Sequence, residues 1–212
     1  MDVSSTGGGS TVKRTDLVQW ADVAGAEATL VQRCVAGDEM ACATLVADHQ
    51  RMVVLLAINL LGDREEALDL AQEVFLRVFR TLQQFRGQSS LRTWIYRIVV
   101  NQAQNRRRLW RRRHRTDQVP LDVHLAAHGD PPSVPGTRPD SLLAQKELAE
   151  RLQAALNALP FDQRTAIVLR EVDGLSYEEM AFSLGVAVGT VKSRLMRARQ
   201  ALRDALRSER MS

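Results

Sequence analysis

Twelve arginines lie in one stretch of the chain, residues 74–116, that contains no aspartate or glutamate. The whole chain carries a formal net charge of only +4, so the remaining residues sum to −8. Charge separated in this way increases repulsion within the folded protein and indicates a polyanionic partner. Because phosphates bind cations and unstacked bases bind flat rings, the stretch predicts contact with single-stranded or distorted nucleic acid. Aromatic residues among the arginines include Phe85, Trp94, Tyr96 and Trp110.

The other reactive side chains form no catalytic or metal-binding pattern. The four histidines stand apart from any ligand-like or nucleophilic neighbour, and two cysteines, Cys34 and Cys42, are too few for a disulfide framework. We expect both to be reduced, partly buried thiols, with a redox or metal-binding role as the alternative. We therefore expect no cofactor, no metal and no enzymatic activity.

Composition favours an all-α protein of the cytoplasm. Alanine, leucine, arginine, glutamine and glutamate are abundant and β-branched runs are scarce. The first ten residues lack the apolar segment of a signal peptide, and residues 1–23 are expected to form a disordered tail. The best apolar stretch, 52–61, is about half of the ~20 residues that a membrane span needs, so no membrane insertion is expected.

A proline-rich stretch divides the chain in two. Five of the six prolines fall within residues 117–140, which predicts a flexible linker there. The apolar periodicity on either side predicts two helical domains, 24–116 and 141–208, of four helices and of three or four helices. The helices expected in the first domain cover 26–36, 38–61 with Asp38 as its cap, about 62–82 and about 91–113. The apolar face expected on the third helix carries Ala67, Leu68, Ala71, Val74, Phe75, Val78, Phe79 and Leu82.

The sharpest local signal, at 174–206, predicts a helix-turn-helix. Ser176 and Glu179 have the spacing of a capping box, which starts a short helix, and Gly185 suits the left-handed turn that ends it. The following helix is expected to bury Val191, Leu195, Ala198 and Leu202. Its outer face can then reach phosphates and base edges in a major groove. A helical hairpin with a solvated basic face is the alternative interpretation. This face carries Gly189, Lys192, Ser193, Met196, Arg197 and Gln200, flanked by Arg194.

Three ordered motifs together resemble a bacterial sigma factor of the extracytoplasmic-function group of the sigma-70 family, over about residues 26–207. The resemblance implies a promoter-specificity subunit of RNA polymerase, with region 2 at 24–116 and region 4 at 141–208. It also implies an anti-sigma factor as a partner. Departures from the family pattern are Cys42, Val46 and His49, where aromatics are common, and Ala187, where proline or serine is usual. The motifs are GDREEALDLAQEVFLR at 62–77, FRG at 85–87 with LRTWIYRI at 91–98, and LSYEEMA at 175–181 with GTVKSRL at 189–195.

The resemblance assigns a role to three sets of residues. A polar stripe on the third helix would bind the clamp helices of the polymerase largest subunit: Asp69, Gln72, Glu73, Leu76 and Arg80. A loop and the helix after it would read and melt the −10 element: Phe85, Arg86, Gln88, Ser89, Ser90, Arg92, Trp94, Arg97, Asn101 and Asn105. The recognition helix would read the −35 element while its domain meets the polymerase flap: Gly189, Thr190, Lys192, Ser193, Arg194, Met196 and Arg197.

Some alternatives stay open. Periodicity places Trp94 in the core, whereas the resemblance places it beside the melting site. The chain could also be a stand-alone helix-turn-helix regulator, which would not need the polar stripe at 69–80. An RNA-processing enzyme is a further alternative, against which the lack of converging catalytic side chains counts.

Overall fold

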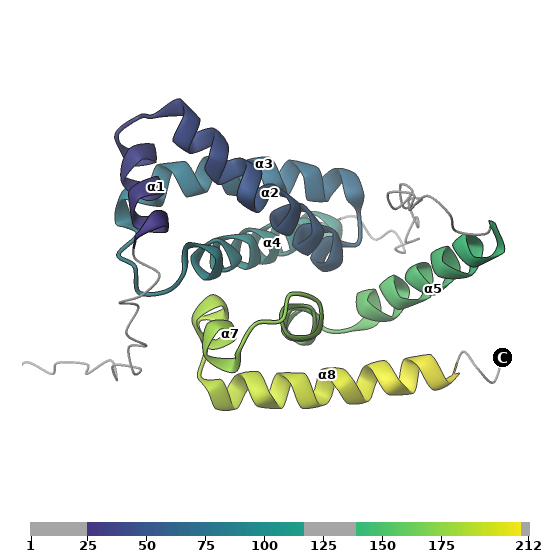
Figure 1. Cartoon of the computed structure of the whole chain (residues 1–212). Helices are drawn as coiled ribbons and strands as arrows, with labels where there is room; N and C mark the ends of the chain where they lie inside the picture. Colours follow the sequence, from purple (N-terminus) through teal and green to yellow (C-terminus); the bar gives the residue numbers. More distant parts are fainter. Residues whose placement is uncertain (1–24, 117–138, 209–212) are drawn as a thin grey trace, which may run out of the picture.

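The computed structural model describes residues 25–116 and 139–208, which form α-helices and, within these ranges, no strand (Figure 1). The all-α class predicted from composition is thereby confirmed. The predicted tail and all but the end of the predicted linker lie outside the described residues. The N-terminal half consists of α1 (Ala26–Val35), α2 (Glu39–Leu61), α3 (Arg64–Thr81), the 3-10 turn η1 (Leu82–Gln84) and α4 (Leu91–Thr116). The C-terminal half consists of α5 (Pro139–Ala158), α6 (Phe161–Ile167), the π-helical segment η2 (Val168–Val172), α7 (Tyr177–Leu184) and α8 (Val188–Ser208).

Local side-chain caps set the starts of α2 and α3. The Asp38 carboxylate accepts a hydrogen bond from the backbone N–H of Ala41 at 3.1 Å, as predicted for the start of α2. The Asp63 carboxylate does the same for the backbone N–H of Glu66 at 2.8 Å. Between them Gly62 ends α2 with a φ of +78°, a conformation that a side chain disfavours. The chain therefore reverses between α2 and α3 for reasons that are local in sequence.

The buried stripe of α3 differs in part from the predicted one. Leu68 and Phe79 were expected to face inward, but they are 41% and 36% exposed, and Leu70 is fully buried instead. Successive residues of an α-helix are about 100° apart, so Leu68 and Phe79 each lie beside the stripe and not within it. The buried residues of α3 are Ala67, Leu70, Ala71, Val74 and Val78.

Helix α2 is the most apolar of the described helices, and it is long and apolar enough to cross a membrane, with a mean hydropathy of 1.4. The prediction that no stretch approaches that length was therefore wrong. The helix nevertheless packs against α1, α3 and α4, and its Leu45, Val53 and Leu56 are fully buried. These contacts are those of a helix that packs one face on the core of the protein.

The two halves pack against each other and share one contiguous apolar core. Helix α4 lies between the α2–α3 layer and the C-terminal half in Figure 1, and α7 packs directly on it. Helix α2 also contacts α5, α6 and η2. This docked arrangement sets which of the predicted binding residues face solvent.

Candidate nucleic-acid and protein interfaces

The predicted helix-turn-helix is formed by α7 and α8. The capping box is confirmed, because the Ser176 backbone N–H donates to Glu179 Oε2 at 2.8 Å and the Glu179 backbone N–H donates to Ser176 Oγ at 3.2 Å. Gly185 ends α7 with a φ of +64°. The predicted buried face of α8 packs inward through Val191 and Leu195, which turns the opposite face outward.

Most residues predicted to read the −35 element are exposed on this outer face, namely Gly189, Thr190, Lys192, Met196 and Arg197. Met196 is 67% exposed, so its apolar side chain is open to a partner. The two remaining members are half-buried and already bonded. Ser193 Oγ donates to the Thr190 carbonyl at 2.9 Å, and Arg194 forms an ion pair with Asp162 of α6 at 2.8 Å.

The predicted polar stripe of α3 is exposed along its whole length, from Asp69 through Gln72, Glu73 and Leu76 to Arg80. Leu76 is 56% exposed. The apolar residues that the inward prediction misplaced, Leu68 and Phe79, lie beside it on the same helix. Helical periodicity places Leu68 and Phe79 outside the face that carries Val74 and Val78, and this was the signal in the sequence that could have identified them as exposed.

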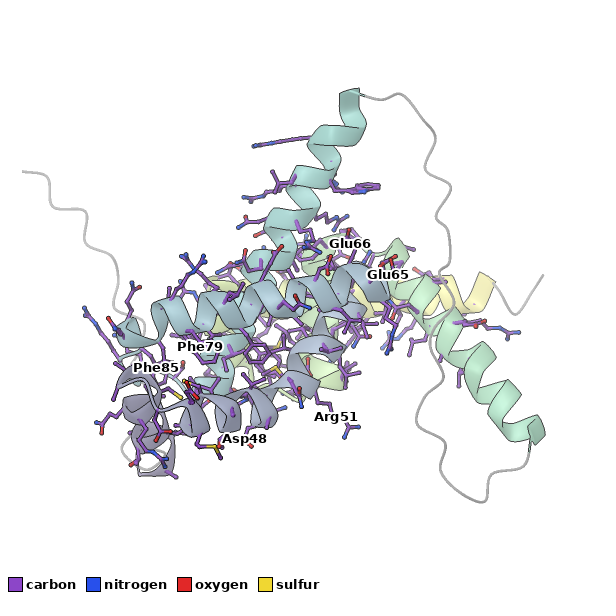
Figure 2. The ribbon with its side chains drawn as sticks, turned by 90° about the horizontal axis from the view of Figure 1, so that it is seen from above. Asp48, Arg51, Glu65, Glu66, Phe79 and Phe85 are labelled. Carbon is purple, nitrogen blue, oxygen red and sulfur yellow. The ribbon has the colours of Figure 1, made fainter. Side chains whose placement is uncertain are left out.

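The exposed face of α2 and α3 points away from the C-terminal half. Figure 2 looks onto this face from above, and its labels mark Glu65, Glu66 and Phe79 on α3 and Asp48 and Arg51 on α2. Docking of the halves therefore leaves this surface open to a partner.

Arg106 on α4 has a structural role that the sequence did not reveal. Its guanidinium donates to Glu66 Oε2 and to Glu73 Oε1, both at 2.7 Å, and to the Glu66 carbonyl at 2.8 Å. The bonds tie α4 to α3, so Arg106 is engaged by carboxylates and not held ready for phosphate. Glu73, predicted to meet the polymerase, has this intramolecular partner as well.

The loop predicted to read the −10 element is only partly exposed. Phe85 and Trp94 are half-buried and pack against each other, with ring centroids 5.5 Å apart and planes tilted by 58°. Ser89 is 4% exposed and its Oγ donates to the Ser90 carbonyl at 3.1 Å, so it does not offer its hydroxyl to a base here. Six members of the set are exposed to solvent: Arg86, Gln88, Arg92, Arg97, Asn101 and Asn105.

Tyr96 is not available for stacking, contrary to the expectation from the sequence. It is 1% exposed, and its hydroxyl accepts a hydrogen bond from Arg92 Nη2 at 3.1 Å. Burial raises the pKa of Tyr96 to about 12. Trp110 and Leu109, near the end of α4, are 41% and 53% exposed and are the apolar side chains that do accompany the arginines.

The C-terminal half covers part of the surface predicted to read the −10 element. Ser183 Oγ of α7 donates to the Thr93 carbonyl of α4 at 3.3 Å, and Thr93 Oγ1 donates to Glu179 Oε1 at 3.4 Å. The Arg97 guanidinium lies 5.4 Å above the ring of Phe182. The docked arrangement thus places part of the predicted −10 surface against the helix-turn-helix.

A buried arginine joins the halves a second time. Arg164 of α6 is 6% exposed, and its Nη1 donates to the Leu60 carbonyl at the end of α2 at 2.8 Å. Its Nη2 bonds the carbonyl of Asn157 within its own half. Burial and the charge of Arg107 together lower the pKa of Arg164 to about 10, so Arg164 remains protonated at neutral pH.

The cysteines lie close together at the junction of α1 and α2. Cys42 Sγ is 3.8 Å from the Cys34 carbonyl, and both thiols are free. Burial raises the pKa of Cys34 to about 11, which keeps it protonated and unreactive at neutral pH. Within the described residues no three His, Cys, Asp or Glu side chains gather in a way that could hold a metal ion.

Comparison with known proteins defines the class that this fold and these surfaces represent. The chain matches Sigma-70 region 2 over residues 45–116 and Sigma-70, region 4 over residues 149–202. The RNA polymerase sigma-H factor of Pseudomonas aeruginosa is 37% identical over 177 residues, which cover 84% of this chain and 92% of that protein. The ECF RNA polymerase sigma-E factor of Escherichia coli is 37% identical over 175 residues, which cover 82% and 90%.

Solved structures agree. CnrH in complex with the cytosolic domain of CnrY is similar with a TM-score of 0.63 at 26% identity, covering 87% of this chain and 99% of that one. The sigma factor RpoE in complex with the anti-sigma factor NepR from Bartonella quintana gives a TM-score of 0.60 at 28% identity, covering 78% and 96%. The chain therefore belongs to the extracytoplasmic-function group of the sigma-70 family, as its three motifs predicted. As an RNA polymerase sigma factor it is a transcription initiation factor that directs the polymerase to promoters and promotes strand opening.

Proposed function

We propose that the N-terminal half binds core polymerase through α3 and reads and melts the −10 element through the 85–90 loop and α4. The C-terminal half reads the −35 element through α8, and the intervening segment spans the distance between the two elements. The observation that carries this division is the exposure of two separate faces, the α3 stripe around Leu76 and the α8 face around Met196. Buried apolar anchors with charged rims are typical of specific interfaces.

Each interface uses different chemistry. On α3, Leu68, Leu76 and Phe79 supply apolar area, while Asp69 and Arg80 at the rim set orientation and association rate. On α8, Lys192 and Arg197 bind phosphates or guanine edges, and Met196 contacts the methyl groups or faces of bases. These contacts contribute binding energy alone, so we propose that the protein performs no catalytic step of its own.

Strand opening requires that α4 trap unstacked bases, which offsets an unstacking cost of a few kcal/mol. Arg86, Gln88 and Asn101 are exposed and lie on the surface that would receive them. Trp94 supports this surface from the core side through its packing on Phe85. The alternative of a stand-alone regulator does not account for the region 2 match.

We also propose an anti-sigma factor as a partner and the cytoplasm as the place of action. Both similar solved structures hold a second protein, which is named an anti-sigma factor in the RpoE complex. The open α2–α3 face, with exposed Leu55 and Leu76, offers a surface that such a partner could share with polymerase.

In vitro transcription tests the proposal. The purified chain is added to sigma-free bacterial core polymerase with fragmented genomic template, and the 5′ ends of the transcripts are sequenced. Discrete start sites that share −35 and −10 elements are expected. Absence of initiation, together with absence of core binding by gel filtration, would contradict the proposal and favour the stand-alone regulator.

A further inference from the structure

A cleft of about 570 Å³ opens where the two halves meet, between the carboxyl-terminal part of α4, the start of α6 and the start of α8. Its lining is strongly cationic. Five guanidinium groups and one carboxylate contribute to it, and they come from both halves of the chain. These residues are Arg107, Arg108 and Arg111 of α4, Asp162 of α6, and Arg194 and Arg197 of α8.

The positive charge in this cleft is largely uncompensated. Asp162 is bonded to Arg194 at 2.8 Å, whereas Arg108, Arg111 and Arg197 have no ion pair within the residues whose side chains the structure describes. The guanidinium of Arg107 lies 5.3 Å above the ring of Phe161, which supplies contact but no counter-charge. Burial and the neighbouring charge of Arg111 lower the pKa of Arg107.

The chemistry and size of the cleft indicate its ligand. Planar guanidinium groups bind phosphate oxygens in a two-pronged geometry, and several of them converging select for several phosphates. A volume of about 570 Å³ is typical of sites for nucleotide-sized molecules. We propose that the cleft binds a small polyphosphate anion, such as tripolyphosphate or the phosphate chain of a nucleotide, which bridges α4 to α8 and holds the halves together.

Duplex DNA does not fit the same place. A recognition helix in a major groove, about 12 Å wide, has DNA strands along both its flanks. Here the arginines of α4 line one flank of α8, beside Thr190 and Arg197, so a duplex could enter only after the halves separate. Anion and −35 duplex would therefore exclude each other. That competition rests on the proposed function, whereas anion binding itself does not.

Isothermal titration calorimetry of the full chain with sodium tripolyphosphate at constant ionic strength tests the proposal. One anion per chain is expected. The double substitution Arg108→Gln with Arg111→Gln should weaken binding by about tenfold or more, since charge-assisted bonds are lost. The matched control is Arg64→Gln with Arg77→Gln, two exposed arginines of α3, which removes the same charge and should change affinity by less than about twofold.

A third variant should change the affinity for tripolyphosphate in the opposite direction. Asp162→Asn removes the carboxylate from the lining and frees Arg194, so tripolyphosphate should bind more tightly; a protein that merely misfolds would bind less tightly. Lack of saturable binding, equal weakening in both double variants, or weaker binding by Asp162→Asn would overturn the proposal.

A parallel titration with duplex DNA distinguishes a small polyphosphate from the phosphates of the DNA backbone as the ligand. One outcome is that tripolyphosphate does not bind, and that Arg108→Gln with Arg111→Gln weakens binding of a non-specific duplex whereas the α3 control variant does not. These arginines would then contact the DNA backbone, and the proposal would be wrong. The transcription assay contains nucleoside triphosphates, which belong to the proposed class of ligand, whereas the calorimetric titration contains neither nucleotides nor DNA. The titration therefore tests anion binding independently of whether the chain initiates transcription.

Discussion

Replacing Arg164 with methionine should loosen the docking of the two halves. The guanidinium makes one bond across the interface, to the Leu60 carbonyl at 2.8 Å, and its other bonds stay within the C-terminal half. Methionine keeps the length and apolar character of the stem but removes the donor. Among its hydrogen bonds only the Leu60 bond differs between the docked and separated arrangements. Burial of the guanidinium and repulsion by Arg107 oppose docking, so this bond sets the upper limit of the effect.

The magnitude follows from that single bond. A hydrogen bond involving a charged group contributes about 1.5–3 kcal/mol net. At about 1.4 kcal/mol per factor of ten, loss of this bond in Arg164→Met should shift the balance toward separated halves by at most roughly 10- to 150-fold. If the wild-type protein is mostly docked and docking blocks α8, the apparent affinity for a −35 duplex should increase by the same factor.

Two measurements check this, fluorescence anisotropy with a −35 duplex and the radius of gyration from small-angle X-ray scattering. The matched control is Arg170→Met, because Arg170 Nη1 donates to the Leu175 carbonyl at 2.7 Å within one half. That variant should lose stability to urea without expanding.

The reasoning fails if Arg164→Met leaves both the radius and the affinity unchanged while the wild-type protein is compact, or if Arg170→Met expands the chain equally. A wild-type radius that already matches separated halves would refute the docked arrangement itself.

Three further predictions concern the separate surfaces. Lys192→Ala with Arg197→Ala should abolish −35-dependent initiation in a reconstituted transcription assay and leave co-elution with core polymerase intact; lost co-elution would argue against the division of roles. Gln72→Ala with Leu76→Ala should weaken core binding by about tenfold, measured by competition, without changing −35 duplex affinity, because α3 lies away from α8. Burial raises the pKa of Asp173, and its Oδ2 has no hydrogen-bond partner among the described residues. The folded protein therefore favours the protonated carboxyl group, and the stability that this group contributes is lost as pH rises through the raised pKa. Asp173→Asn should therefore increase the urea midpoint at pH 7, with a gain that shrinks as pH falls toward the ordinary value of 3.8, and an equal gain at both pH values would contradict this cause.

Features controlled by neighbours in the sequence could be predicted from the sequence alone. The Asp38 cap lies three residues from its partner Ala41, and the Ser176–Glu179 capping box has the same spacing. Such contacts form within one helical turn, so the residue types and their spacing suffice. The exposed outer face of α8 follows from the same reasoning, because its apolar residues recur at helical intervals.

The two wrongly predicted residues of α3 show where a count of apolar residues fails. Leu68 and Phe79 are apolar and close to the buried stripe, and a count of apolar residues includes them. Their exposure depends on which neighbours cover α3, and α2 and α4 reach only the side that carries Leu70 and Val74.

Only the tertiary structure decided which charged and aromatic side chains remain available. Tyr96 is buried beneath the C-terminal half, and Arg106 is bonded to Glu66, which lies 40 residues away. Arg164 bonds Leu60 across 104 residues. Contacts between residues so far apart depend on how preformed helices dock, and helical periodicity carries no information about that docking. The sequence by itself determined the helices, their caps and the family motifs, whereas the docking of the two halves decided which surfaces are open and created the arginine-lined cleft between them.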